Sequence, residues 1–435
     1  LRAAHFSREG RHRVVTCVAP CAMPSCRSFV WTLGGITAAV GPGRIAREVF
    51  EVDEQPPATA GHVDSAGAMA ATRAFAATGV TPDQVGIPFA ATRAASVEPY
   101  AEGREFYPRL LDDIAAATSS VHILMFGWKP GAVGAAVSDC LLDRLANGVE
   151  VRVLVDSFGS RPYGSSKRMY TELADAGAEI VVNDLLPPDR RGRYPGGVPR
   201  WPMSTIGRSD HRKLYVIDGA TMWTGGAGIE DHFENGEFHD VMVRLRGDVV
   251  RQAQSAFLTS FAAQGGPLPE GLDTYFPEPA DSGAIECRIG QVVPGGHISA
   301  TYAARELIDR ASDRLDIMNP YLTDADVISR IAAAADRGVR VRIVVSERSN
   351  NFLASAALKH HYRLLLDAGV EIWEYPGAVV HAKVIIADDR VQFGTLNLDA
   401  WALYRNFEFA VVADSGDVVD DFRRALFEPD IERSE

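Results

Sequence analysis

Two short stretches of the chain combine histidine, lysine and aspartate at the same spacing. The first stretch begins at His211 and reads HRKLYVID, and the second begins at His381 and reads HAKVIIAD. Lysine occurs at only five positions of this chain, and two of them lie in these stretches. Random placement predicts on the order of 0.01 such triplets in a chain of this composition. The repetition therefore indicates a shared chemical role.

The two motifs supply the candidate catalytic residues. These are His211, Lys213, Asp218, His381, Lys383 and Asp388. The apolar and β-branched residues after each lysine predict a strand, on which side chains two positions apart share a face. Each histidine is therefore expected to point the same way as its lysine, and each aspartate is expected to begin the turn into a returning strand.

Two imidazoles and two ammonium groups suit phosphoryl transfer without a metal ion. The ammonium groups can neutralise a phosphodiester anion and the charge that develops on its oxygens. One imidazole can attack phosphorus, and the other can protonate the leaving alcohol. In-line displacement needs one histidine on each side of phosphorus, which two facing half-sites would provide. This chemistry calls for no metal and no other cofactor.

Residues beyond the motifs extend the candidate site. The turns TGGAG and GTLN offer phosphate-binding groups at Gly226, Thr395 and Asn397. Asp240 and Glu408 follow at similar separations from the two histidines. A carboxylate that accepts a hydrogen bond from each imidazole Nδ1–H would fix the tautomer and stabilise the imidazolium. Ordinary solvated acids remain the alternative interpretation of these two residues.

The same order of elements surrounds each motif. A helix followed by a strand is predicted for LLDRLANGVEVRVLVD in the first copy and for VISRIAAAADRGVRVRIVV in the second. A further helix and strand are predicted for MYTELADAGAEIVVN and YRLLLDAGVEIWEY, and the motif then begins a pair of strands. This alternation predicts an α/β fold built from two similar halves.

The repeat and the local composition divide the chain into four segments. Residues 1–85 are predicted to be a poorly ordered tail with one short helix near Ala68–Ala77. The first half is expected over residues 86–264 and the second over residues 285–435. Residues 265–284 are dense in Pro and Gly, which is typical of a linker.

An additional segment of the first half lies directly before its motif and is rich in arginine. It contains Arg190, Arg191 and Arg193, with Tyr194 and Trp201 nearby. Arginine can bind phosphate through two parallel hydrogen bonds, and Tyr and Trp favour the headgroup region of a bilayer. We expect this loop to lie at the mouth of the site and to bind an anionic membrane surface, with a merely solvated loop as the alternative.

Composition limits the classes of function. The 435 residues are 46% hydrophobic and 23% charged, as in ordinary globular proteins. The net charge of −13 argues against a protein that coats nucleic acid. No apolar stretch is long enough for a membrane span, and the N-terminal residues fit a signal peptide poorly. The five cysteines match no zinc pattern. We expect a cytoplasmic protein, and its association with membranes would be peripheral.

The motifs and their surroundings resemble the phospholipase D superfamily, and within it the bacterial cardiolipin synthase group. The resemblance covers roughly residues 84–435 and rests on HRKLYVIDG followed by TGG, NPYLTDADV, LLDAGVEIWEY, HAKVIIADD, GTLNLDA and NFEF. It implies two phospholipase D-like α/β/α halves that form a bilobal, pseudo-twofold structure. It also implies a ping-pong reaction through a covalent phosphohistidine.

The resemblance further implies a role for each candidate residue. His211 would be the nucleophile and His381 the general acid. The phosphate would be held by Lys213, Lys383 and Asn397. Asp240 and Glu408 would orient the imidazoles, and the two motif aspartates would brace their hairpins rather than contact substrate.

The chain also departs from the family pattern. Gly228 stands where the first half of this family has Asn, so the second half is expected to contribute more of the phosphate binding. LDAWAL replaces LDxRS, which removes an Arg and a Ser. No stretch matches the two membrane helices that are common in cardiolipin synthases.

The leading interpretation is a phosphatidyltransferase or phospholipase that moves a phosphatidyl group from a phospholipid to an alcohol acceptor or to water. A nuclease or other phosphodiesterase on the same scaffold is the alternative. The acidic balance and the scarcity of lysine count against it, because affinity for nucleic acid depends on many phosphate contacts. An inactive phosphate- or lipid-binding protein is disfavoured by the intact motifs in both halves.

Overall fold

The computed structural model describes residues 67–70, 72, 90–183, 209–294 and 296–434. All of these residues belong to one compact unit. The arginine-rich loop with Arg190, Arg191 and Arg193 lies outside the described residues, as does most of the predicted tail. The described part of the tail, residues 67–70 and 72, is helical. There Thr72 is buried and its hydroxyl oxygen lies 2.8 Å from the Ser255 hydroxyl.

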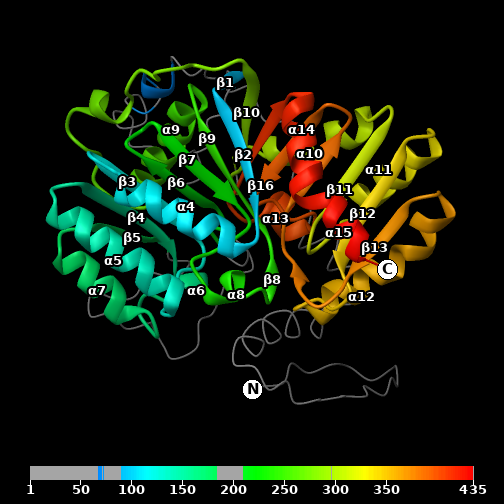
Figure 1. The fold of residues 1–435 in the computed structure, drawn as a ribbon, viewed down its shortest axis with the longest axis horizontal. Coiled ribbons are helices and arrows are strands. Elements are labelled where there is room, and N and C mark those ends of the chain that lie inside the picture. Colours follow the sequence, from blue (N-terminus) through cyan, green and yellow to red (C-terminus); the bar gives the residue numbers. More distant parts are fainter. Residues whose placement is uncertain (1–66, 71, 73–89, 184–208, 295, 435) are drawn as a thin grey trace, which may run out of the picture. The chain divides into compact units, whose positions relative to one another are not determined.

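The first half is built around a seven-stranded mixed sheet (Figure 1). In spatial order its strands are β2 (Ser96–Ala101), β9 (Val241–Arg246), β7 (Thr221–Gly225), β6 (Lys213–Ile217), β3 (Ser120–Met125), β4 (Glu150–Asp156) and β5 (Glu179–Asn183). The last three strands are parallel to one another, and the other pairs are antiparallel. Its helices are α4 (Gly103–Ala115), α5 (Ala132–Ala146), α6 (Ser157–Ser160), α7 (Lys167–Asp175), α8 (Asp231–Glu234) and α9 (Val249–Ala263).

The second half contains an eight-stranded sheet. In spatial order its strands are β1 (Thr92–Ala94), β10 (Ile285–Val292), β17 (Glu408–Asp414), β16 (Arg390–Gly394), β15 (Val384–Ala387), β11 (Arg314–Met318), β12 (Arg340–Ser346) and β13 (Glu371–Tyr375). Its helices are α10 (Ser299–Arg310), α11 (Ala325–Asp336), α12 (Phe352–Asp367), α13 (Ala400–Tyr404), α14 (Gly416–Phe422), the π-helix η3 (Arg423–Phe427) and α15 (Glu428–Arg433). The predicted linker contains a 3-10 helix, η2 (Leu272–Tyr275).

The two sheets have the same strand order once β1 is set aside, which confirms the predicted pair of similar α/β halves. The agreement extends to the helix ends. Gly148 and Gly338 follow α5 and α11, and Gly177 and Gly369 follow α7 and α12, all four with positive φ. Glycine is favoured just past a helix end because it adopts this left-handed conformation without steric cost.

The N-terminal strand pairs with the sheet of the second half. A first half that begins at residue 86 would include β1, but β1 pairs antiparallel with β10 of the second sheet. The chain then passes into β2, which pairs with β9 of the first sheet. A segment of three residues carries too little pattern to show which sheet it joins, so only tertiary packing decides its partner.

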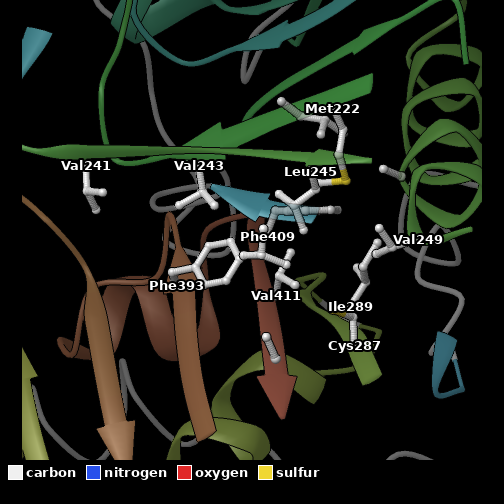
Figure 2. Packing of buried hydrophobic residues seen from close by; sticks show 14 of the residues in the cluster. Met222, Val241, Val243, Leu245, Val249, Cys287, Ile289, Phe393, Phe409 and Val411 are labelled. Atoms are coloured by element: carbon white, nitrogen blue, oxygen red, sulfur yellow. The ribbon is translucent and has the colours of Figure 1, made fainter. Parts of the chain in front are cut away.

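A cluster of buried hydrophobic residues joins the two sheets (Figure 2). Strand β9 contributes Val243 and Leu245, and strand β17 contributes Phe409 and Val411. Residues two positions apart on a strand share a face, so each strand directs one face toward this common core. Asp240 directly precedes β9 and Glu408 begins β17. The core therefore places both candidate carboxylates where the halves meet.

Candidate active site

Each candidate histidine is hydrogen bonded to a carboxylate of the other half. His211 Nδ1 lies 3.1 Å from Glu408 Oε2, and His381 Nδ1 lies 2.6 Å from Asp240 Oδ2. The backbone of each histidine is also hydrogen bonded to the other half, an arrangement called here the exchange between the halves. His211 N donates to Phe407 O at 3.0 Å, and His381 N donates to His239 O at 2.7 Å. The structure thus brings together all four residues, and neither half holds a complete site by itself.

The exchange at His381 is reinforced by a short two-stranded sheet. Strand β8 (Phe238–His239) of the first half pairs in parallel with β14 (Val379–Val380) of the second. The residues that follow these two strands are Asp240 and His381. Because the strands run side by side in the same direction, their next residues emerge next to each other, which explains the short distance between the carboxylate and the imidazole.

Both motif lysines are buried beside the histidines. Lys213 Nζ donates to His211 O at 2.6 Å and lies 5.0 Å from the centre of the Phe126 ring. Lys383 Nζ lies 2.8 Å from His381 Nδ1 and also donates to His381 O. The predicted placement of histidine and lysine on one face is consistent with these contacts. Two cationic groups therefore flank the imidazoles in a site that excludes most water.

Burial lowers the pKa of Lys213 to about 8 and that of Lys383 to about 7. Burial, followed by the nearby lysines, holds the pKa of His211 well below its usual value and lowers that of His381 to about 3. Burial is the first cause in all four groups, because a site that excludes water disfavours charged forms, and a neighbouring lysine adds to it for Lys383 and both histidines. An anionic phosphate between the lysines would favour their protonated forms.

The two carboxylates differ in charge state. Burial raises the pKa of Glu408 to about 8, although Lys213 opposes the rise. Burial also acts to raise the pKa of Asp240, but Lys383 and the hydrogen bond from His381 outweigh it, and the net pKa is lowered. At neutral pH Asp240 therefore presents an ionised carboxylate to His381, whereas burial favours the protonated form of Glu408 beside His211.

Binding of a phosphodiester anion is expected to take up protons near pH 8. The free lysines lose protons as the pH rises through 7 to 8, whereas a bound anion stabilises the ammonium forms. Affinity should therefore fall, for each lysine, by up to about tenfold per pH unit above the pKa of that lysine. Calorimetry of dimethyl phosphate binding in buffers of different ionisation enthalpy measures this uptake. An affinity that is constant from pH 6 to pH 9 would contradict it.

Among the predicted phosphate ligands, Asn397 has the environment that suits the role. Its side chain is buried, and within the described residues its Oδ1 finds no hydrogen-bond partner. Asn319 holds the loop on both sides of it, since Asn319 Nδ2 donates to Leu396 O and Leu398 N donates to Asn319 Oδ1, each at 3.1 Å. Sequence reasoning assigned no role to Asn319, although it begins the quoted stretch NPYLTDADV.

The other two predicted phosphate ligands have their polar groups engaged inside the protein. Thr395 Oγ1 donates to Glu408 Oε2 and accepts a hydrogen bond from Phe409 N at 2.9 Å. Gly226 N donates to Val241 O at 3.3 Å, and a Cβ at Gly226 would lie 2.4 Å from Asp240 Oδ1. Both residues thus lie against the carboxylates that hold the histidines, and their direct contact with phosphate stays a prediction.

The motif aspartates lie at the far ends of the strands. Asp218 accepts hydrogen bonds from the backbone N–H groups of residues 118–120, and Asp388 accepts them from those of residues 312–314. Each aspartate lies five positions beyond its lysine, which corresponds to about 16 Å of strand. Both have positive φ, at 53° and 54°. They brace the turns and do not reach the histidines.

Each half has one side chain that holds the residue directly before its histidine. In the first half Asp156, at the end of β4, accepts a hydrogen bond from Asp210 N at 2.8 Å. In the second half Ser346, at the end of β12, accepts one from Val380 N at 2.8 Å. The two positions are equivalent in the repeat, and both side chains are buried. Sequence reasoning missed them because their partners lie far along the chain.

Ser346→Ala is expected to lower kcat about fivefold and leave KM near that of the parent. Loss of one hydrogen bond costs about 1 kcal/mol, which corresponds to this factor in rate when it is fully felt. Steady-state kinetics with a phosphodiester measures it. Ser346→Thr keeps the hydroxyl and should recover part of the loss, and Ser329→Ala on the exposed face of α11 is the matched control. Equal kinetics for the two alanine variants would rule out the positioning role.

The described part of the chain contains neither a cluster of metal ligands nor a membrane-spanning helix. No group of three or more His, Cys, Asp or Glu side chains there is arranged to hold a metal ion. None of the helices in that part has both the length and the apolar character needed to cross a bilayer.

Comparison with known proteins supports the resemblance seen in the sequence. Residues 110–258 and 304–429 match the family model described as cardiolipin synthase, PLD-like domain. The two segments make up more than half of the chain, so the chain belongs to this family. The crystal structure of the phosphatidylserine synthase of Haemophilus influenzae Rd KW20 shares the fold, with a TM-score of 0.57 at 12% identity, over 84% of this chain and 91% of that one.

Curated relatives include several cardiolipin synthases. The major cardiolipin synthase of Bacillus subtilis strain 168 is 28% identical over 332 residues, which cover 73% of this chain and 65% of the relative. Cardiolipin synthase 2 of Bacillus anthracis is 30% identical over 346 residues, which cover 75% of this chain and 63% of the relative. The chain thus spans slightly less than two thirds of the length of these relatives.

Proposed function

We propose that this protein transfers a phosphatidyl group from a phospholipid to an alcohol acceptor or to water through a covalent phosphohistidine. The observation that carries the proposal is the shared site, in which two imidazoles and two buried lysines from different halves converge. The carboxylates hold the imidazoles at Nδ1, so Nε2 is the nitrogen left to react. The similarity to cardiolipin synthases supports a phospholipid as the donor.

The first half-reaction uses His211 as the nucleophile. A bond forms between His211 Nε2 and phosphorus while the bond from phosphorus to the leaving alcohol breaks, and His381 gives its Nε2 proton to the leaving oxygen. In the second half-reaction the acceptor oxygen attacks phosphorus, His381 takes the acceptor's proton, and the bond to His211 breaks. Lys213 and Lys383 neutralise the phosphate oxygens throughout.

The different charge states of the carboxylates favour this division of roles. Ionised Asp240 stabilises an imidazolium on His381, which a general acid needs. Largely protonated Glu408 gives no such stabilisation to His211, which must be neutral to attack. Burial and then Lys383 lower the pKa of His381, and a bound phosphodiester anion would offset the effect of Lys383.

The test is a panel assay of the purified chain with EDTA present throughout. The substrates are phosphatidylglycerol vesicles with and without glycerol, bis-p-nitrophenyl phosphate, and single-stranded DNA. We expect lipid transfer or hydrolysis and no loss of activity with EDTA, because the lysines supply the positive charge. Cleavage of DNA without any lipid turnover would replace the proposal with the nuclease interpretation.

We also propose peripheral association with an anionic membrane surface, where the lipid donor resides. Arg190, Arg191 and Arg193 are the candidates from the sequence and lie outside the described residues. Sedimentation with phosphatidylglycerol vesicles over a range of salt concentrations tests the association. Electrostatic binding weakens with salt, and an absence of binding at low salt would contradict the proposal.

A further inference from the structure

Exposed large hydrophobic side chains are confined to two segments of the described chain. They are Phe158, Tyr163, Phe352, Leu353, Leu364 and Leu366. The first two follow strand β4, and the other four lie on α12, which follows strand β12. Because β4 and β12 are equivalent strands of the repeat, the same region is apolar and exposed in both halves.

In the first half this region is hydrogen bonded to the wall of the active site. Ser160, in the same short helix as Phe158, donates from Oγ to Phe126 O at 2.8 Å. The Phe126 ring in turn packs edge-on against the His211 ring, with 4.8 Å between centres. Asp156 binds both the N–H of Phe158 and the N–H of the residue before His211. Phe158 therefore lies at the edge of the sheet where His211 is placed.

In the second half an equivalent set of contacts leads to the start of α12. Asn319, which holds the loop of Asn397, is followed by Tyr321, whose hydroxyl donates to Asn350 Oδ1 at 2.9 Å. Asn351 then caps α12 by accepting a hydrogen bond from Leu353 N at 3.1 Å. Phe352, with 81% of its side chain exposed, and Leu353 thus lie at the same edge as the second half-site.

The far end of α12 provides a contrast within one helix. Leu364 and Leu366 are 49% and 54% exposed, and the helix rise places them about 18–21 Å along the axis from Phe352. The fold itself does not require exposed apolar residues on this helix, as the equivalent helix of the first half shows. The equivalent helix α7 is described throughout, and its exposed residues are polar, charged or alanine.

The charge of both segments is opposite to that of the chain as a whole. Residues 157–170 contain Arg161, Lys167 and Arg168 and no acid. Residues 347–363 contain three basic residues, two histidines and one acid. In a chain with a net charge of −13, residues 157–170 form a local basic region around Phe158 and Tyr163, whereas Lys359 and Arg363 of α12 pair with Glu374 and Asp367. This combination binds the interface of an anionic bilayer, where apolar groups enter the acyl boundary and cations contact headgroups.

We propose that Phe158, Tyr163, Phe352 and Leu353 form a membrane-facing rim that inserts into the surface of an anionic bilayer. The rim borders both half-sites, so insertion would bring the phosphodiester of a membrane lipid to the two histidines without extracting the lipid. The proposal rests on the proposed function, because it takes the substrate to be a lipid that remains in its membrane.

The test compares two sets of exposed substitutions. The rim variant combines Phe158→Ser, Phe352→Ser and Leu353→Ser, and the matched control combines Leu364→Ser and Leu366→Ser. Each is measured by sedimentation with phosphatidylglycerol vesicles and with phosphatidylcholine vesicles, and thermal unfolding checks that both fold. We expect at least about tenfold weaker binding of the rim variant to anionic vesicles and binding of the control within about twofold of the parent.

Three outcomes would overturn the rim. In the first, the rim variant binds vesicles as the parent does. In the second, binding by the control weakens as much as binding by the rim variant. In the third, the parent binds no vesicles and the rim variant loses binding to single-stranded DNA. The second outcome would mean that the whole outward face of α12 docks on another surface. Hydrolysis of soluble bis-p-nitrophenyl phosphate separates the two proposals. If the parent hydrolyses it, the catalytic chemistry stands whatever becomes of the rim, and we expect the rim variant to retain it.

Discussion

His211→Ala is expected to eliminate turnover of every phosphodiester. The loss of activity in His381→Ala should instead depend on the leaving group, and it should be larger for a leaving group of higher pKa. A missing nucleophile cannot be replaced by a better leaving group. A general acid contributes about 10²–10⁴-fold when an alkoxide must leave. It contributes little when the leaving group is a stable phenolate, as with bis-p-nitrophenyl phosphate. The two variants should therefore differ most on activated substrates.

The second half-reaction extends this prediction. Without His381 no imidazole activates the acceptor, so an activated substrate should give a burst of one p-nitrophenol per site followed by slow turnover. The phosphorylated intermediate should accumulate on His211 and be found by mass spectrometry under conditions that avoid acid. If the leaving-group dependence instead appears in His211→Ala, or the label is found on His381, the two roles are reversed.

Asp240→Asn is expected to reproduce the His381 defect, with a loss of about 10²–10⁴-fold on a phospholipid. The hydrogen bond between Asp240 and His381 joins the two halves, and a neutral amide cannot stabilise an imidazolium. The loss should shrink on bis-p-nitrophenyl phosphate, because that substrate needs no general acid in its first step. Burst kinetics on the two substrates measure the difference.

Glu408→Gln is the matched variant for the other carboxylate. It should slow the attack by His211 on both substrates alike, because Glu408 contacts His211 and not His381. At pH 7 its effect should be smaller than that of Asp240→Asn, since burial already raises the pKa of Glu408 to about 8 and the glutamine resembles the protonated acid. The deficit should grow above pH 8, because the native carboxyl then ionises and stabilises the positive charge that forms on a neutral His211 as it attacks. If the activated substrate rescues Glu408→Gln instead of Asp240→Asn, the exchange between the halves is not used in catalysis.

The local pattern of the chain was sufficient for much of the fold. Alternating helices and β-branched strands predicted two α/β halves, and the glycines after α5, α7, α11 and α12 marked equivalent helix ends. Such features depend on residues close together in sequence, so they can be recognised without knowing the packing. The partner of β1 could not be recognised in this way.

For the residues of the site, too, some features follow from local sequence and others only from tertiary contacts. The sequence by itself paired His211 with Lys213 and His381 with Lys383, because side chains two positions apart on an extended chain share a face, although the strands begin only at Lys213 and Val384. It also identified both carboxylates. Only the tertiary structure decided that Glu408 binds the histidine of the first half and Asp240 that of the second.

Packing is the physical reason for that exchange. The apolar faces of β9 and β17 are buried in one core shared by the two sheets, which brings the start of each strand to the opposite half. The same long-range contacts engaged the Thr395 hydroxyl with Glu408 and placed Asp156 and Ser346 behind the histidines. Residue spacing along the chain carries no information on contacts of this kind, because they form only when the two apolar faces meet.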